Sequence, residues 1–194
     1  MHVFLGITGA SGAPYAARLL SALTGAGCRV GLSASRAGIE VLATELYGEP
    51  ALPREEVLTR FTAGAEGVEV YEPHDFSAPY ASGSARVDAY VLCPCSMGTL
   101  ASVAAGTMEN LIQRAASVAL KEGRRLVLVP RETPLSAIHL ENMLRARNAG
   151  AVILFAAPGY YHGPVSIDDL VDFVVARILD QLGVENTLMK RWGQ

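Results

Sequence analysis

Two short segments rich in glycine and serine have the residue types and spacing that suit the binding of a phosphate group. GITGASGAP at 6–14 and PCSMGT at 94–99 each follow an apolar run and lead into a helical pattern. Backbone N–H groups and the helix dipole attract anions at such a point, although a glycine-rich turn can also form without a ligand. The first segment is spaced G-x-x-G-x-x-G, which is neither the dinucleotide fingerprint nor the P-loop. We therefore predict a phosphate ligand that is bound in neither of these ways.

Two other motifs contain residues that metal ions use as ligands, but both have a simpler explanation. Cys-Pro-Cys at 93–95 lacks the second cysteine pair or the histidine of a typical zinc site, which favours two small buried thiols. Asp-Asp-Leu-Val-Asp at 168–172 is similar to the motif that binds Mg²⁺ and diphosphate in all-helical prenyl synthases. Here it follows Ser166 at the start of an amphipathic helix, where acidic residues favour the helix dipole. We therefore predict helix capping and no metal site.

Four basic residues and a tyrosine pair stand where a second anionic group could bind. Arg114 and Lys121 are seven residues apart on one predicted helix and share a face, and Arg131 directly follows a predicted strand. A solvated surface cation is the commonest explanation for such residues. Arg177 lies in an apolar helical stretch, where an arginine usually has a carboxylate or a phosphate as its partner. For the tyrosines of PGYYHGP at 158–164, core packing or an interface contact is the default explanation.

Apolar runs and helical periodicity alternate along the chain. Short apolar runs predict strands at 2–7, 28–34, 68–72, 88–93, 125–130 and 151–156, and helical periodicity predicts helices at 13–25, 36–46, 98–104, 109–122, 136–147 and 167–182. This order predicts an α/β fold, a doubly wound parallel sheet of the Rossmann or flavodoxin type with helices on both faces. Residues 47–67 have the weakest pattern, and we expect a surface excursion there. Ligands of such sheets bind beyond the carboxyl ends of the strands.

Length and composition exclude several classes of protein. The 194 residues are 51% hydrophobic and 18% charged, which suggests extra buried surface through oligomerisation of a single domain, 1–194, with a C-terminal tail at 184–194. A formal net charge of −3 gives no reason to expect a nucleic-acid partner. Three cysteines without a disulfide framework suit a reducing compartment. Because no apolar run reaches membrane-spanning length, we expect a cytoplasmic protein without a membrane partner.

Taken together, these segments resemble one family, the UbiX-type flavin prenyltransferases. The resemblance covers nearly the whole chain and is carried by GITGASGAPYAARLL (6–20), SASRAGIEVLATE (33–45), the continuous stretch from YASGSARVDAYVLCPCSMGT to VDFVVARILDQLG (80–183), and KRWG (190–193). Several such blocks in the same order are far more specific than one glycine-rich loop. The family binds flavin mononucleotide (FMN), so the first loop would serve a single phosphate and need no dinucleotide fingerprint.

The resemblance implies a role for particular residues of this chain. FMN would contact Gly9, Ala10, Ser11, Ser35, Ser96, Met97, Gly98, Thr99 and Arg131. Dimethylallyl monophosphate would contact Ser82, Gly83, Ser84, Arg114, Lys121, Tyr161, Arg177 and, at an aromatic wall, Trp192. The catalytic residues would be Glu45, Lys121, Glu132, Tyr161 and Arg177. In this family the site is built across the subunits of a homododecamer.

The activity implied is a metal-independent transfer of a dimethylallyl group to N5 and C6 of reduced FMN. The product, prenylated FMN, would serve a UbiD-type decarboxylase. A flavin-dependent cysteine decarboxylase is a weaker alternative, because this chain has Ser35-Arg36 where a catalytic histidine would follow the second strand, and PRETPLSAIHLENM at 130–143 instead of a P-x-M-N-x-x-M-W segment. A non-catalytic flavin carrier is the other alternative, and it would leave Arg114, Lys121 and Arg177 without a function.

Overall fold

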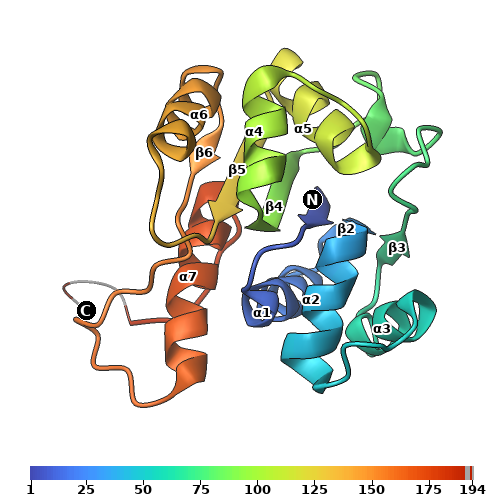
Figure 1. Ribbon diagram of the computed structural model, residues 1–194. Coiled ribbons are helices and arrows are strands. Elements are labelled where there is room, and N and C mark those ends of the chain that lie inside the picture. The colour runs from blue at the N-terminus through green and yellow to red at the C-terminus, as the bar shows by residue number, and fades with distance from the viewer. Residues whose placement is uncertain (191–192, 194) are drawn as a thin grey trace.

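A single six-stranded parallel sheet organises the chain in the computed structural model, which describes residues 1–190 and 193 (Figure 1). The strand order is β3-β2-β1-β4-β5-β6. The strands are β1 (His2–Ile7), β2 (Arg29–Ala34), β3 (Val68–Val70), β4 (Ala89–Cys95), β5 (Arg125–Pro130) and β6 (Val152–Ile153). The helices are α1 (Ala13–Gly25), α2 (Arg36–Tyr47), α3 (Arg54–Phe61), α4 (Met97–Ala105), α5 (Leu111–Lys121), α6 (Ala137–Asn148) and α7 (Ile167–Leu182), with a 3₁₀ turn, η1 (Pro79–Ala81). The predicted fold class is confirmed.

Helices cover both faces of the sheet and divide the core into two layers. One core cluster joins side chains of β1 such as Val3 and Leu5 to α1, α2, α3 and α7. The other joins Phe4, which lies between Val3 and Leu5 on β1, to α4, α5 and α6. Successive residues of a strand point to opposite faces, so a strand buried on both sides feeds both layers. Figure 1 shows the first group of helices in its lower half and the second in its upper half.

Two elements differ from the sequence-based expectation. Within residues 47–67, expected to be a surface excursion, Arg54–Phe61 forms helix α3. Its Val57, Leu58 and Phe61 are buried in the first core cluster, so packing stabilises a helix too short to be stable alone. The strand expected at 151–156 is reduced to Val152–Ile153.

Side-chain caps set the starts of several helices and explain the aspartate-rich motif. Ser166 and Asp169 form a capping box: the Asp169 N–H donates to Ser166 Oγ at 3.1 Å, and the Ser166 N–H donates to Asp169 Oδ2 at 2.9 Å. Hydrogen bonds from the N–H groups of Val165 and Ser166 and from the Ser166 hydroxyl hold the pKa of Asp169 below its usual value. Asp172 pairs with Arg18 of α1 at 2.5 Å. The predicted capping role of the motif is confirmed.

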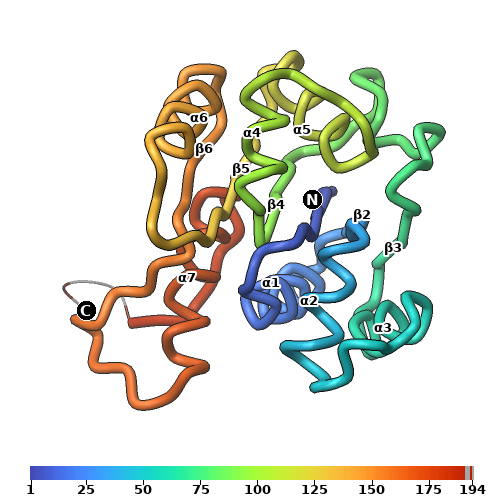
Figure 2. The backbone as a smooth tube through the Cα atoms, in the orientation of Figure 1, coloured from blue at the N-terminus to red at the C-terminus, as the bar shows by residue number. Residues whose placement is uncertain are grey.

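The strand order places a topological switch point beside β1. The chain leaves β1 toward β2 and, through α2 and α3, toward β3 on one side, then returns through the 71–88 segment to β4 on the other (Figure 2). The loops after β1 and β4 therefore lie next to each other at the carboxyl edge of the sheet. This is where ligands bind in open α/β sheets.

Candidate functional site

Thr8 joins the two glycine-rich loops. Its N–H and its hydroxyl both donate to the Pro94 carbonyl, at 3.1 and 3.0 Å, and its hydroxyl accepts from the Ser96 N–H at 2.7 Å. Thr8 is only 2% exposed. Sequence reasoning missed this residue, although a hydroxyl at the end of a buried apolar strand was the available signal. Thr8 fixes the two loops relative to each other.

The first turn of α4 is open to a ligand. Ser96 caps the helix by accepting from the Thr99 N–H at 3.2 Å, but the N–H groups of Met97 and Gly98 have no acceptor among the described residues. A Cβ atom added to Gly98 would meet nothing within 4 Å. Unpaired N–H groups at the positive end of a helix dipole suit a polar or anionic ligand. The residues at this point fit the FMN that the resemblance implies.

The first turn of α1 differs from the expectation of an open anion site. Glu45, at the end of α2, accepts from the N–H groups of Gly12 and Ala13 through Oε2, at 2.9 and 2.8 Å. The carboxylate therefore occupies the position that an external anion would take. A cavity of about 340 Å³ lies beside it, lined by Gly9 and by α2 residues that include Glu45. Of the two phosphate-binding turns that the sequence predicts, only the one at α4 is open.

Close packing brings the start of α2 to the same place. A Cβ atom on Gly9 would lie 2.5 Å from Cβ of Ala37, so only glycine permits this approach of the first loop to α2. Gly12 has φ of +135°, which disfavours other residues. Ser35 caps α2 by accepting from the Gly38 N–H at 3.0 Å. The starts of α1, α2 and α4 therefore surround one region.

Arg131 closes this region from β5. Its Nε donates to the Ser11 carbonyl at 3.4 Å, while Ser11 itself is exposed and Ala10 is buried. Glu132, the next residue, accepts from the Thr133 N–H at 3.0 Å. We call residues 8–12, Ser35, 96–99 and Arg131 the strand-end cluster. This cluster contains every residue that the family resemblance implies for contact with FMN.

A second group of predicted residues lies along α5, and we call Ser82, Gly83, Ser84, Arg114 and Lys121 the α5 cluster. Arg114 Nε donates to the Ala81 carbonyl at 2.9 Å, and the Ser82 and Ser84 hydroxyls hydrogen-bond at 2.8 Å. Lys121 forms an ion pair with Glu122. A Cβ atom on Gly83 would lie 2.1 Å from Glu122 Oε1 and 2.6 Å from Lys121 Nζ, so the Lys121–Glu122 pair lies directly against Gly83. Arg114 and Lys121 share the helix face predicted for them.

Tyr161 and Arg177 belong to a third region, which we call the α7 cluster. The Tyr161 ring packs edge-on against Phe173 of α7 with a centroid distance of 5.7 Å. Arg177 Nη1 donates to Asp180 Oδ2 at 3.0 Å, so its partner in this chain is a carboxylate. Phe173 and Arg177 line a cavity of about 260 Å³ beside β6. Trp192 lies outside the described residues.

The α5 and α7 clusters are not brought together within one copy of the chain. Helix α5 packs in one core layer and α7 in the other, so the sheet stands between them. In Figure 1, α5 lies in the upper half of the view and α7 in the lower half. A phosphate group that touched Lys121, Tyr161 and Arg177 together would need residues from more than one copy.

The two cysteines of the Cys-Pro-Cys segment are fully buried thiols. Burial raises the pKa of both, that of Cys95 to about 12, which disfavours the thiolate form that metal ions require. Over residues 1–190 and 193, no group of three or more His, Cys, Asp or Glu side chains could hold a metal ion. In the same part of the chain, every helix is too short or too polar to cross a membrane.

Comparison with known proteins gives matches over the whole chain. The model of the family described as Flavoprotein matches residues 1–179. A protein of Pseudomonas aeruginosa named flavin prenyltransferase UbiX is 53% identical over 197 residues, covering 100% of this chain and 94% of the relative. A relative of the same name from Methanocaldococcus jannaschii is 42% identical, covering 100% and 99%.

Solved structures agree with these matches. The structure of AnUbiX in complex with FMN and dimethylallyl pyrophosphate has a TM-score of 0.89 and 39% identity, covering 100% of this chain and 97% of that one. A dodecameric FMN-dependent UbiX-like decarboxylase from Escherichia coli O157:H7 has a TM-score of 0.88 and 41% identity, covering 100% of both chains. An FMN-dependent cysteine decarboxylase shares only the fold, at 15% identity and a TM-score of 0.63.

Proposed function

The chain belongs to the Flavoprotein family and, within it, to the UbiX-type flavin prenyltransferases, and from this premise we propose that it transfers a dimethylallyl group from dimethylallyl monophosphate to reduced FMN. The observation that carries the proposal is the open first turn of α4 beside Ser11 and Arg131, at the switch point of a chain 53% identical to a flavin prenyltransferase. The product is FMN that carries a fourth ring, closed by bonds to N5 and C6.

The strand-end cluster binds the flavin in this proposal. The N–H groups of Met97 and Gly98 and the exposed Ser11 hydroxyl offer donors to the phosphate and polar edge of FMN. Arg131 holds the first loop through the Ser11 carbonyl and adds positive charge. Reduced FMN supplies the nucleophilic N5 and C6 atoms. The protein binds it and orients those atoms toward the allylic carbon.

The α5 and α7 clusters act on the leaving phosphate. The allylic C–O bond breaks while the bond to N5 forms, and inorganic phosphate departs with the electron pair. A monophosphate is a poor leaving group, and metal-dependent enzymes bind Mg²⁺ to assist such departures. Lys121 and Arg177 instead stabilise the developing charge, and the Tyr161 hydroxyl donates a hydrogen bond to it. Trp192, from outside the described residues, would give an aromatic wall that stabilises allylic cation character through its π face.

In this proposal two carboxylates, Glu45 and Glu132, move protons during ring closure. Glu45 is fixed by the Gly12 and Ala13 N–H groups at 2.9 and 2.8 Å, beside the strand-end cluster. Glu132 follows Arg131 in the sequence and accepts from the Thr133 N–H at 3.0 Å. Closure of the ring needs a proton on the prenyl double bond, which makes the tertiary carbon electrophilic toward C6, and C6 then loses its own proton; a carboxylic acid within reach donates the first proton and a carboxylate accepts the second.

We further propose that the protein acts as a homo-oligomer, a dodecamer, in the cytoplasm. The separation of the α5 and α7 clusters by the sheet supports a phosphate site completed by other copies. The dodecameric UbiX-like relative supports the same assembly. The product would pass to a decarboxylase of the UbiD type.

The proposal is tested by incubating the protein with reduced FMN and dimethylallyl monophosphate in the absence of air. We expect mass spectrometry to find flavin that is heavier by one dimethylallyl unit. A parallel reaction with the diphosphate, the ligand in the related structure, measures donor preference. Failure to form the adduct with either donor would contradict the proposed function.

A further inference from the structure

Arg54, at the start of α3, fixes the carboxyl end of β2. Strand β3 pairs with β2 as far as Leu32 and Val70, after which the Tyr71 N–H donates to the Leu32 carbonyl at 2.8 Å. The next carbonyl on that side of β2 belongs to Ala34, because carbonyls alternate sides along a strand. It accepts from Arg54 Nη1 at 2.9 Å. The guanidinium thus continues the hydrogen-bond ladder where β3 ends.

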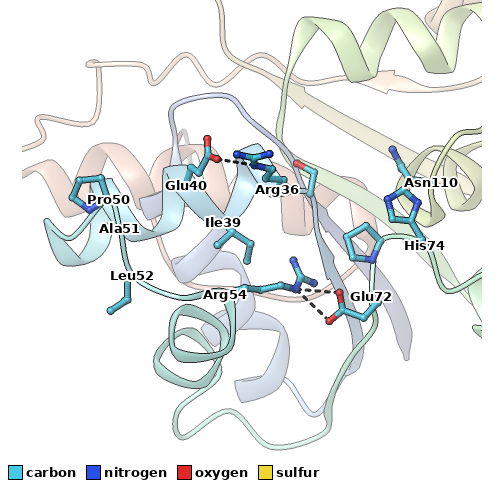
Figure 3. A pocket seen from close by; sticks show the side chains of 12 residues that line it. Arg36, Ile39, Glu40, Pro50, Ala51, Leu52, Arg54, Glu72, His74 and Asn110 are labelled. Atoms are coloured by element: carbon cyan, nitrogen blue, oxygen red, sulfur yellow. Dashed lines mark hydrogen bonds and ion pairs between the residues drawn. The ribbon is translucent and has the colours of Figure 1, made fainter.

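Glu72 holds Arg54 in this orientation. Arg54 Nε lies 3.2 Å from both carboxylate oxygens of Glu72, as Figure 3 shows. Arg54 Nη2 is buried without a hydrogen-bond partner in the part of the chain that the structure describes. An unpaired buried donor costs free energy, so a residue kept only for surface charge would not be placed in this way. The pairing of Nε with Glu72 and the hydrogen bond from Nη1 to the Ala34 carbonyl therefore explain why an arginine stands here.

The carbonyl that Arg54 holds directly precedes Ser35. Ser35 caps α2, and the N–H groups of Arg36 and Ala37 have no acceptor among the described residues. The same turn touches the first loop at Gly9. With the start of α1 occupied by Glu45, the open N–H groups of α2 and α4 are the ones that remain for a phosphate. Ser35 and Arg54 also line one cavity of about 540 Å³.

We propose that Arg54 is a positioning residue for the phosphate of FMN. It acts through Ala34 and Ser35: by holding the end of β2, it sets the position of the α2 N–H groups that bind the phosphate. This inference rests on the proposed function, because it takes FMN as the ligand. Arg54 has no place among the FMN-binding residues that the family resemblance implies.

The test compares FMN with riboflavin, which lacks the phosphate. Flavin-free protein is titrated with each ligand and binding is followed by flavin fluorescence. In Arg54→Met we expect FMN to bind about tenfold more weakly, because displaced α2 N–H groups lose the equivalent of one hydrogen bond to the charged phosphate, while riboflavin binds as in the parent protein. In Arg54→Lys we expect partial recovery, because one ammonium group cannot bond Ala34 and Glu72 in the same planar geometry.

Arg60→Met is the matched control. Arg60 lies on the same helix but pairs with Glu49 and Glu56 on the surface, so its loss leaves both affinities unchanged. An Arg54→Met protein with the parent ratio of FMN to riboflavin affinity would overturn the proposal, and so would equal weakening of both ligands. Parent protein that binds neither flavin would contradict the proposed function instead.

A milder variant covers the case in which Arg54→Met does not fold. Glu72→Gln keeps the Arg54 side chain and its bond to Ala34 but removes the ion pair that orients it. We expect a severalfold loss of FMN affinity with unchanged riboflavin affinity. An unchanged ratio of the two affinities in this variant would also overturn the proposal.

Discussion

The residues that follow β1, β2, β4 and β5 meet at one edge of the sheet, whereas the basic residues of α5 and α7 lie on opposite faces of it. The carboxyl ends of neighbouring parallel strands are a few ångströms apart, so their loops converge in any chain with this fold. The outer surfaces of helices on the two faces are separated by the sheet and by both core layers.

This difference indicates how the two halves of the proposed site are built. One copy supplies the strand-end cluster, with Ser11, Ser35, the 96–99 turn and Arg131. One copy cannot bring Lys121 to Arg177. Flavin binding and prenyl transfer should therefore respond differently to mutation.

The largest effect is expected from Ser11→Asp, which places a carboxylate in the strand-end cluster, beside the proposed phosphate position. Like charges a few ångströms apart in a partly desolvated site repel strongly, so FMN should bind at least about a hundredfold more weakly and prenylation should be lost with it. Binding is measured by flavin fluorescence and folding by circular dichroism. Ser21→Asp, an exposed site on α1, is the control. A Ser11→Asp protein saturated with FMN would place the phosphate elsewhere.

Arg177→Ala and Tyr161→Phe should give the opposite pattern. Both proteins should retain FMN but form the prenyl–flavin adduct about a hundredfold more slowly, because these donors act on charge that develops in the transition state. Single-turnover measurements prevent product release from hiding the chemical step. Arg145→Ala, at an exposed position on α6, is the control. Adduct formation at the parent rate in both variants would show that Arg177 serves only as the ion-pair partner of Asp180.

Thr8→Val should have a moderate effect, mainly on the free energy of unfolding. The variant keeps the shape of the side chain but leaves the Ser96 N–H without the acceptor it has at 2.7 Å. A buried unpaired donor costs about 1–3 kcal/mol, which urea denaturation of flavin-free protein at fixed concentration would detect. Thr24→Val is the control, because the Thr24 hydroxyl only donates to carbonyls of its own helix. Equal stability of the two variants would mean that Thr8 does not join the loops.

Removal of metal ions should leave the rate of adduct formation unchanged. Prolonged treatment with EDTA should leave the rate of adduct formation unchanged, because cationic side chains and the Tyr161 hydroxyl stabilise the leaving phosphate in this account. The rate before and after treatment is measured with and without added Mg²⁺. Loss of activity that Mg²⁺ restores would assign the charge stabilisation to a metal ion.

The sheet and the strand-end cluster were predictable because they depend on local patterns. Apolar runs mark buried parallel strands, and the rule for the carboxyl edge then places Ser11, the 96–99 turn and Arg131 together without any knowledge of side-chain contacts. Helix α3 was not predictable in this way. It is short, and its stability comes from burying Val57, Leu58 and Phe61 against elements distant in the sequence.

Two contacts at the site also depend on tertiary structure alone. Glu45 reaches the start of α1 because α1 and α2 pack side by side, so an apparently open anion site is capped from another helix. Arg54 reaches Ala34 because β3 stops pairing at Leu32, two residues before the end of β2. No local sequence pattern marks that point. In each contact one side chain hydrogen-bonds to backbone groups that lie 20 to 33 residues away in the sequence.

The central claim is that one copy binds the flavin while several copies complete the phosphate site, and complementation tests it most directly. Lys121→Ala and Arg177→Ala proteins are each assayed alone, then co-expressed and purified as mixed oligomers, with retention of FMN as the control for folding. If the two residues act from different copies, about a quarter of the sites in a random mixture regain both residues and adduct formation returns. Mixed oligomers no more active than the separate variants would show that Lys121 and Arg177 do not meet across copies, which would contradict the account.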